Sequence, residues 1–166
     1  MTTYKELYDR QETLQRLSAQ AGHREYTDHE LNLALLDELG ELTHELKGIW
    51  CWWKPRGGVC KKKALSEMAD VLHFVLLRDL NRGARPSWQG RVVEPFTQLP
   101  LGSSWQERLL SLATFGGPEE PDAWEFFALV QGALDQLGLQ QSDLLDAYFA
   151  KTDENLRRWN AAKEVK

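Results

Sequence analysis

The sequence predicts an all-α fold, an antiparallel bundle of helices whose core a partner subunit could complete. Three observations favour it. Apolar residues recur every three or four positions along most of the chain, which is the period of an α-helix. Side chains that cap helices precede these segments, and glycine or proline follows several of them. No internal repeat or low-complexity tract interrupts the pattern, so we expect residues 1–166 to form one all-α domain.

Two helices are predicted in the first third of the chain. The first covers roughly residues 4–19. Thr27 or Asp28 can cap the second through its side-chain oxygen. The sequence KPRGG at residues 54–58 ends it, because proline and paired glycines do not continue a helix cheaply. The two apolar stripes are Leu7, Leu14 and Leu17, then Leu31, Leu35, Leu39, Leu42, Leu46 and Ile49.

Four more helices are expected in the rest of the chain. Residues 82–103, which follow the first of these, are rich in glycine and proline and predict a long loop, in which RVVEPF could form a short extended piece. Ser142 or Asp143 is the expected cap of the last helix. The expected ranges are 63–81, with the stripe Ala64, Met68, Val71 and Val75, then 104–114, 122–137 and 142–161.

Charge and composition exclude several classes of protein. The net charge is −5, without the basic excess of proteins that wrap nucleic acid, so no nucleic-acid polymer is expected as a partner. No apolar run approaches the ~20 residues that span a bilayer, and the polar N-terminus lacks a signal peptide. The two cysteines, Cys51 and Cys60, are too few for a disulfide framework and lack the spacing of a zinc site. We therefore expect a cytoplasmic protein with reduced thiols and no membrane association.

Carboxylates border the apolar stripes of two predicted helices. On a helical wheel, three share one arc of the second helix and two share an arc of the third, whereas Asp37 is expected to point elsewhere. Like charges one turn apart cost a helix about 0.2–0.5 kcal/mol, and partial burial costs more. A hard divalent cation, Mg²⁺ or Mn²⁺, would remove this cost because it takes oxygen ligands. The carboxylates on the two arcs are Glu38, Glu41 and Glu45, then Glu67 and Asp70.

Two other interpretations of these carboxylates stay open on the sequence alone. The glutamates could form a solvated helix face, or each pair could be neutralised by the lysines that precede the third helix. Zinc peptidase chemistry is excluded, because HELKG at His44 lacks the second histidine of HExxH. The histidines show no ligand spacing, and His73 is expected to point away from Glu67 and Asp70. The lysines in question are Lys61, Lys62 and Lys63.

Aromatic and cationic residues beyond the carboxylates could bind a base and phosphates. A tryptophan cluster, Trp50, Trp52 and Trp53, stands beside Lys54 and Arg56. Core packing is the usual role of tryptophan, but an aromatic wall beside a cation also suits a flat base and a phosphate. One face of the last helix, through positions i, i+4 and i+7, is either solvated or binds an anion and a polar base or sugar. Its members are Lys151, Asn155 and Arg158.

Four blocks occur in order: ELGELTHE, WCWWK, SEMADVLHF and AYFAKTDENLRRWN. They resemble the all-α nucleoside triphosphate pyrophosphatases, the superfamily that includes MazG, and within it the dimeric dUTPase family. The ExxE…ExxD pattern marks the superfamily. Features more specific to the dUTPase branch are Trp50, Trp53 and Lys54, then His73 and Phe74, then Tyr148, Lys151, Asn155 and Arg158.

The resemblance implies a homodimer that hydrolyses dUTP to dUMP and pyrophosphate with two or three Mg²⁺ ions. It implies metal ligation by Glu38, Glu41, Glu67 and Asp70, with Glu45 in support and Glu41 placed to hold a bridging ion or the attacking water. Lys54, Lys151 and Arg158 would meet phosphates. Asn155, a tryptophan of the cluster and Gln11 would contact the nucleoside.

The chain also departs from the family pattern. The family often continues its last helix with Gln after the arginine and an Asn-Gly-Tyr tail, whereas this chain has Trp159 and NAAKEVK. These departures bear on base selectivity more than on the chemistry. The alternatives are hydrolysis of dCTP as well as dUTP, or of a modified nucleotide, and, from a different class, a helical interaction module without catalysis.

Overall fold

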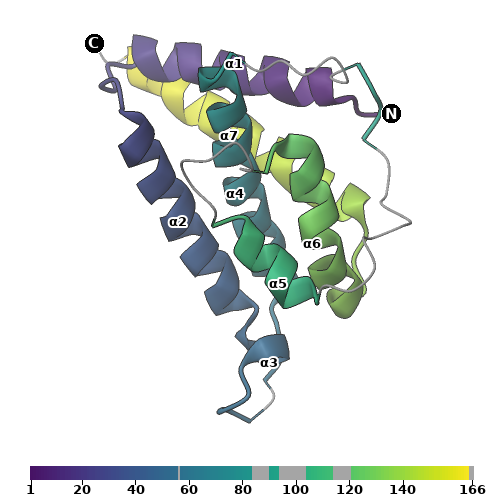
Figure 1. Cartoon of the computed structure of the whole chain (residues 1–166). Coiled ribbons are helices and arrows are strands. Elements are labelled where there is room, and N and C mark those ends of the chain that lie inside the picture. Colours follow the sequence, from purple (N-terminus) through teal and green to yellow (C-terminus); the bar gives the residue numbers. More distant parts are fainter. Residues whose placement is uncertain (56, 84–89, 94–103, 114–120, 165–166) are drawn as a thin grey trace.

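The computed structural model describes residues 1–55, 57–83, 90–93, 104–113 and 121–164, and this part of the chain is all-α (Figure 1). Its one extended pairing is an isolated antiparallel bridge between Thr3 and Val92. The predicted fold class is therefore confirmed. The helices are α1 Tyr4–Gln20, α2 Asp28–Glu45, α3 Lys47–Trp50, α4 Lys61–Asn81, α5 Trp105–Ser111, α6 Ala123–Leu137 and α7 Gln141–Glu164.

Helix α4 is the centre of the bundle. It packs against α2, α7, α1 and α6, and it runs antiparallel to α2, to which the α3 hairpin joins it (Figure 1). A central helix must be apolar around most of its circumference. The predicted stripe of α4 is fully buried, and so are residues beside it, so the helix contacts protein on nearly every side. The buried side chains include Ala64, Met68, Ala69, Val71, Leu72, Val75 and Leu76.

Helices α1 and α2 form at the predicted places for the predicted reason. Thr27 caps α2 through a complete capping box, in which its hydroxyl accepts the Glu30 N–H and the Glu30 carboxylate accepts the Thr27 N–H. Five leucines of the predicted α2 stripe, Leu31, Leu35, Leu39, Leu42 and Leu46, are buried. These contacts hold α2 against α4 in one rotation, which decides where its glutamates point.

The prediction for the second helix is wrong at its C-terminal end. The stripe was expected to continue to Ile49, but α2 ends at Glu45, Leu46 leaves the α-helical region, and α3 begins as a separate turn. The two arms of the hairpin that follows come close together at Gly48. A Cβ on Gly48 would lie 2.5 Å from the Gly57 carbonyl oxygen, so the two arms of the hairpin touch at a residue without a side chain.

The predicted loop 82–103 lies largely outside the described residues. Within residues 90–93, Val93 donates its N–H to the Thr2 carbonyl and Tyr4 donates to the Arg91 carbonyl, at 2.9 and 3.1 Å. The expected extended piece is therefore present in its described part, and it ties the start of α1 to this segment.

The last three helices match their predicted positions with changes at the ends. Ser104 and Asp122 cap α5 and α6 through capping boxes. Helix α5 stops at Ser111, short of the predicted residue 114. The expected cap of α7 is wrong, because α7 starts at Gln141, and Asp143 lies in its first turn, where it accepts the Gln140 N–H at 2.7 Å.

Candidate functional site

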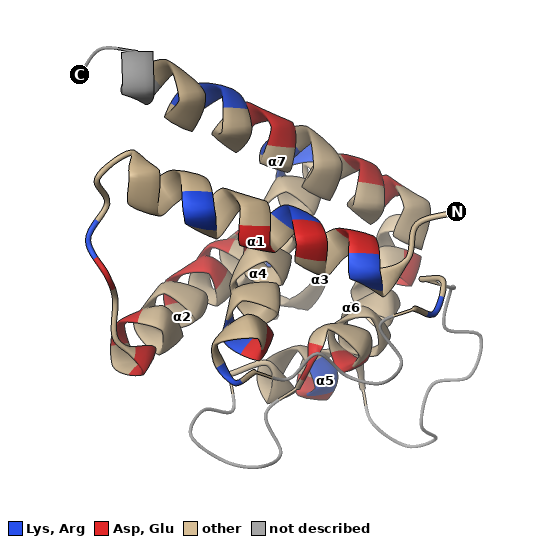
Figure 2. Cartoon of the chain, turned by 90° about the horizontal axis from the view of Figure 1, so that it is seen from above, with Lys and Arg blue, Asp and Glu red and all other residues tan. Residues whose placement is uncertain are grey.

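Three carboxylates from two helices meet between α2 and α4. Glu38 comes from α2, and Glu67 and Asp70 lie one turn apart on α4. One oxygen from each lies within 4.8 Å of the others, and all three side chains are half-buried. We call these residues the carboxylate cluster. Figure 2 shows acidic residues following α2 where it lies beside α4. Packing of the leucine stripe therefore produces the cluster, because the glutamates border that stripe.

Burial and mutual repulsion disfavour the charged forms of the three carboxylates. Burial, followed by the charges of Asp70 and Glu41, raises the pKa of Glu38 to about 7. Burial is also the first cause of the raised pKa of Glu67 and of Asp70, and neighbouring carboxylates add to it. Carboxylates whose pKa values rise together need a proton or a cation. Their oxygens are the donors that hard divalent cations take, so the cluster could bind a metal.

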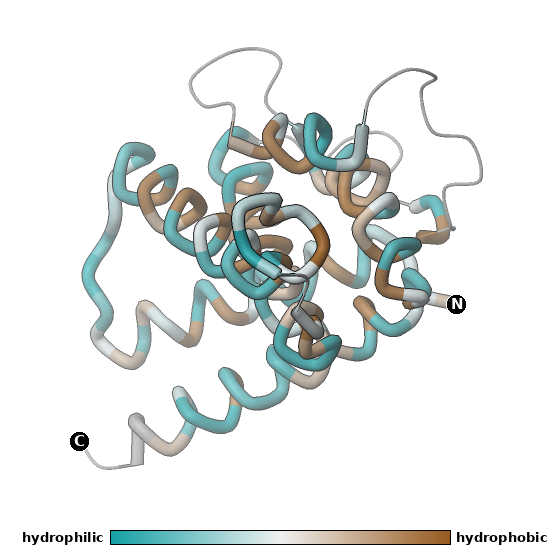
Figure 3. Tube along the Cα trace, turned by 90° about the horizontal axis from the view of Figure 1, so that it is seen from below, coloured by the Kyte–Doolittle hydropathy of each residue, from teal (hydrophilic) through white to brown (hydrophobic). Residues whose placement is uncertain are grey.

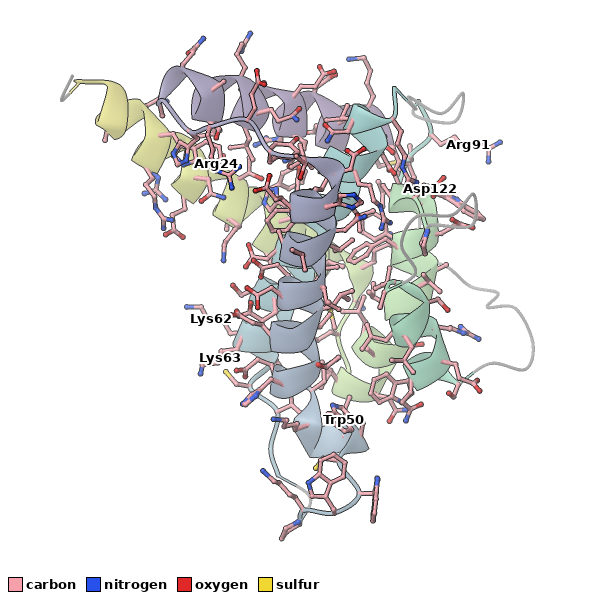
Figure 4. All side chains as sticks on the ribbon, turned by 60° about the vertical axis from the view of Figure 1, so that its left-hand side comes forward. Arg24, Trp50, Lys62, Lys63, Arg91 and Asp122 are labelled. Atoms are coloured by element: carbon pink, nitrogen blue, oxygen red, sulfur yellow. The ribbon has the colours of Figure 1, made fainter. Side chains whose placement is uncertain are left out.

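One cation reaches the cluster from α7. The Lys151 ammonium lies 2.5 Å from Asp70 Oδ2 and 3.4 Å from the Ser66 hydroxyl. One interpretation left open by the sequence was that the lysines at the start of α4 neutralise the carboxylates. Lys61, Lys62 and Lys63 are exposed, and Figure 4 shows Lys62 and Lys63 extending outward. The charge of Lys151, by contrast, lowers the pKa of each of the three carboxylates.

The other predicted ligands, Glu41 and Glu45, lie beside the cluster rather than within it. Both line a groove of about 900 Å³ together with Glu67. The Glu41 charge raises the pKa of each cluster carboxylate. Asp37 lines the same groove, although it was expected to point elsewhere. That expectation is wrong because four residues turn a helix by about 400°, which leaves Asp37 only about 40° from Glu41.

Gln11 forms a buried pair with His73. Its amide oxygen lies 2.8 Å from Nδ1 of the His73 ring. Burial lowers the pKa of His73 to about 3, so the ring is neutral, and it stacks on Tyr148 with ring centres 4.4 Å apart. Gln11 also borders a cavity of about 390 Å³ between α1 and the end of α4, whose lining includes Trp159.

The tryptophan cluster forms an exposed tip at α3. Trp50 is anchored, since its ring N–H donates to the Thr43 carbonyl at 2.8 Å, and Trp53 packs edge-on against it. Trp52 and Trp53 are 87% and 55% exposed, and Lys54 is exposed. The tip lies at the end of α2 away from the C-terminal part of α7 (Figures 1 and 4). The fold therefore does not bring the tip together with Asn155 and Arg158.

The other predicted residues of α7 lie beyond Lys151 along the helix. Asn155 is half-buried. Arg158 is exposed and pairs with Glu154 one turn back at 2.7 Å. The turns of α7 toward the C-terminus are hydrophilic (Figure 3). Of the three cations expected to meet phosphates, the fold places only Lys151 at the carboxylate cluster.

Sequence reasoning did not find two features of this site. It missed the contact between Lys151 and Asp70 and the Ser66 hydroxyl beside it, because helical spacing gives the face of a residue but not its partner on another helix. It also missed the pairing of Gln11 with His73. A signal was available there, since both residues fall on the inward arcs of their helices.

A family model described as dUTPase matches residues 3–162. The chain belongs to this dUTPase family. As a dUTPase, it is an enzyme that hydrolyses dUTP to dUMP and pyrophosphate, and its all-α architecture agrees with the all-α branch of the enzymes. Neither curated proteins nor solved structures match the chain significantly.

In the described part of this dUTPase, no helix combines the length and the apolar character needed to cross a membrane.

Proposed function

We propose that this dUTPase depends on Mg²⁺, with Mn²⁺ as a substitute. The proposed ligands are Glu38, Glu67 and Asp70, with Glu41 and Glu45 in support. The observation that carries the proposal is the convergence of three half-buried carboxylates, whose donor atoms suit a hard cation. Their raised pKa values add support, because the cluster stays partly protonated unless a cation takes the place of the protons.

The reaction needs an activated water and a screened triphosphate. A bound divalent ion would lower the pKa of water and offset the charge of the leaving pyrophosphate. Glu41 and Glu38 are our candidates for the catalytic carboxylates. Glu41 is exposed on the groove, where it can accept a proton from the attacking water, and Glu38 shares the cluster beside it.

Residues outside the cluster would hold the nucleotide. Among the described cations, Lys151 is the best placed for a phosphate, because it already lies at the cluster. The exposed aromatic tip offers a flat surface for a base, and α7 offers an amide. Lys151 is the proposed phosphate contact at the cluster. The other proposed substrate contacts fall into two groups that one protomer does not bring together: Lys54 for a phosphate with Trp50 and Trp53 for the nucleoside at the tip, and Arg158 for a phosphate with Gln11 and Asn155 for the nucleoside on α7 and α1.

We also propose that the protein is a homodimer formed through α2. Leu33 and Leu36 are 64% and 47% exposed, and they share one face of α2 with Gly40. Exposed leucines on adjacent turns favour a partner surface, and a glycine on the same face allows a second helix to approach closely. The same face borders the groove, so a second copy would enclose the site.

The remaining expectations are retained as proposals. We propose that residues 1–166 act as one catalytic domain in the cytoplasm, without binding nucleic-acid polymers or membranes. The free thiols of Cys51 and Cys60 and the acidic net charge support this assignment.

The direct test is pyrophosphate release from a panel of deoxy- and ribonucleoside triphosphates, measured with Mg²⁺ and with EDTA. We expect release from dUTP that requires Mg²⁺ and stops with EDTA. Release from dCTP or a modified nucleotide at a similar rate would keep the metal chemistry and reject a dedicated dUTPase. Release in EDTA equal to that in Mg²⁺ would reject the proposed metal dependence.

A further inference from the structure

The ammonium of Lys151 lies within the carboxylate cluster rather than in solvent. It is 2.5 Å from Asp70 Oδ2 and 3.4 Å from the Ser66 hydroxyl. The Lys151 and Asp70 side chains are 30% and 16% exposed, so water screens this contact only partly. The contact is therefore stronger than an ordinary surface ion pair.

The charges that face this ammonium are negative. Asp70, Glu67 and Glu38 all stabilise its charged form, and they outweigh the burial that opposes it. Glu154, three residues along α7 from Lys151, adds a further negative charge that acts on Asp70. Lys151 is thus the counterion that the described part of the fold supplies to the carboxylate cluster.

A divalent cation bound by the cluster and this ammonium would share the Asp70 carboxylate, whose Oδ2 already contacts Lys151. Two cations on one half-buried carboxylate repel each other, because little water screens their charges. Lysine has a flexible four-carbon stem, so the ammonium can swing away from Asp70 while its backbone stays in α7. A triphosphate bound at the cluster would supply a new anionic partner for it.

We propose that Lys151 is an exchangeable counterion: a divalent cation displaces its ammonium from Asp70, and the displaced ammonium then pairs with a phosphate of the nucleotide. This inference rests on the proposed metal-dependent function and deepens it. It predicts that metal and nucleotide bind cooperatively, because each favours the lysine position that the other requires.

The test compares Mn²⁺ binding by isothermal titration calorimetry in the wild type, Lys151→Met and Lys63→Met. Methionine keeps the stem length and removes the charge. Lys63 is the matched control, since it is an exposed lysine in the first turn of α4, whereas Lys151 contacts Asp70 directly. Lys151→Gln is a second variant with a polar end. Helical circular dichroism and thermal unfolding establish that each variant is folded.

We expect Lys151→Met to bind Mn²⁺ about tenfold more tightly than the wild type without nucleotide, because the competing cation is gone. Lys63→Met should stay within about twofold. The nucleotide probe is deoxyuridine 5′-α,β-imidotriphosphate, whose α–β bridge resists hydrolysis. In the wild type Mn²⁺ should raise the affinity for this probe, and in Lys151→Met the gain should shrink.

Two results would overturn the exchange and have different consequences. If the wild type binds Mn²⁺ and Lys151→Met binds it equally or more weakly, the exchange fails and the metal site stands. If neither the wild type nor the variants bind Mn²⁺, the exchange and the proposed metal dependence fail together.

Discussion

At the scale of single residues, the fold shifts the pKa values of buried groups at and near the site in opposite directions. Burial raises the pKa of Glu38 to about 7 and lowers that of His73 to about 3. In both cases burial disfavours the charged form. The carboxylate can regain its charge through a cation, whereas the histidine has Gln11 and Tyr148 around it and is kept neutral.

We predict that His73 stays neutral well into the acid range. The unfolded chain binds a proton at this residue below about pH 6.5, and the folded chain does not until about pH 3. The unfolded state therefore binds more protons in that window, so His73 makes the free energy of unfolding fall as pH drops below about 6.5. Nitrogen NMR shifts of the ring should stay constant from pH 8 to pH 5.

His29, which is exposed, provides a solvent-accessible ring for comparison in the same spectra. A His73 ring that protonates near neutral pH would contradict the buried pairing with Gln11.

At the scale of secondary structure, most elements could be predicted because the signals are local. Caps such as Thr27 and Asp122 act within one turn, and leucine periods identify a buried face without knowledge of its partner. The hairpin after Leu46 could not be predicted in detail, because the contact of Gly48 with Gly57 joins two residues nine positions apart. The Lys151 contact with Asp70 was missed for the same reason, since it joins two helices.

We predict that Gly48→Ala destabilises the α3 hairpin. The added Cβ would lie 2.5 Å from the Gly57 carbonyl oxygen and 2.9 Å from a Val59 methyl, so the backbone must shift. The free energy of unfolding should fall by about 1–3 kcal/mol. The tryptophan tip should move with it, which intrinsic fluorescence would record.

Gly57→Ala is the matched control in the same hairpin, because a Cβ there meets nothing within 4 Å. It should change the free energy of unfolding by less than about 0.5 kcal/mol. Equal effects of the two substitutions would contradict the close approach.

At the scale of the whole molecule, the protomer leaves an apolar face beside its acidic groove. The exposed face of α2 carries Leu33 and Leu36, while the groove it borders carries Glu41 and Glu67. The carboxylate cluster itself could be predicted as two acidic arcs, because the glutamates border the leucine stripe. The surface that completes the site could not be predicted, because Leu33 and Leu36 lie off the predicted stripe and the sequence does not say what would cover them.

We predict that Leu33→Glu combined with Leu36→Glu converts the protein to a monomer. Burying two glutamate charges in a helical interface costs far more free energy than burying Leu33 and Leu36 contributes to dimerisation. Sedimentation velocity should show half the mass of the wild type. Leu110→Glu, an exposed leucine of α5 at 68% exposure, is the control and should leave the mass unchanged. A wild type that sediments as a monomer would contradict a dimer through α2.

The central claim is that a divalent ion binds where α2 and α4 bring Glu38, Glu67 and Asp70 together. The most direct measurement is anomalous X-ray scattering from crystals grown with Mn²⁺ and deoxyuridine 5′-α,β-imidotriphosphate. We predict a manganese peak within bonding distance of oxygens from all three carboxylates, and its loss in Glu67→Gln. A peak that lies elsewhere, or no peak with the nucleotide analogue bound, would contradict the account.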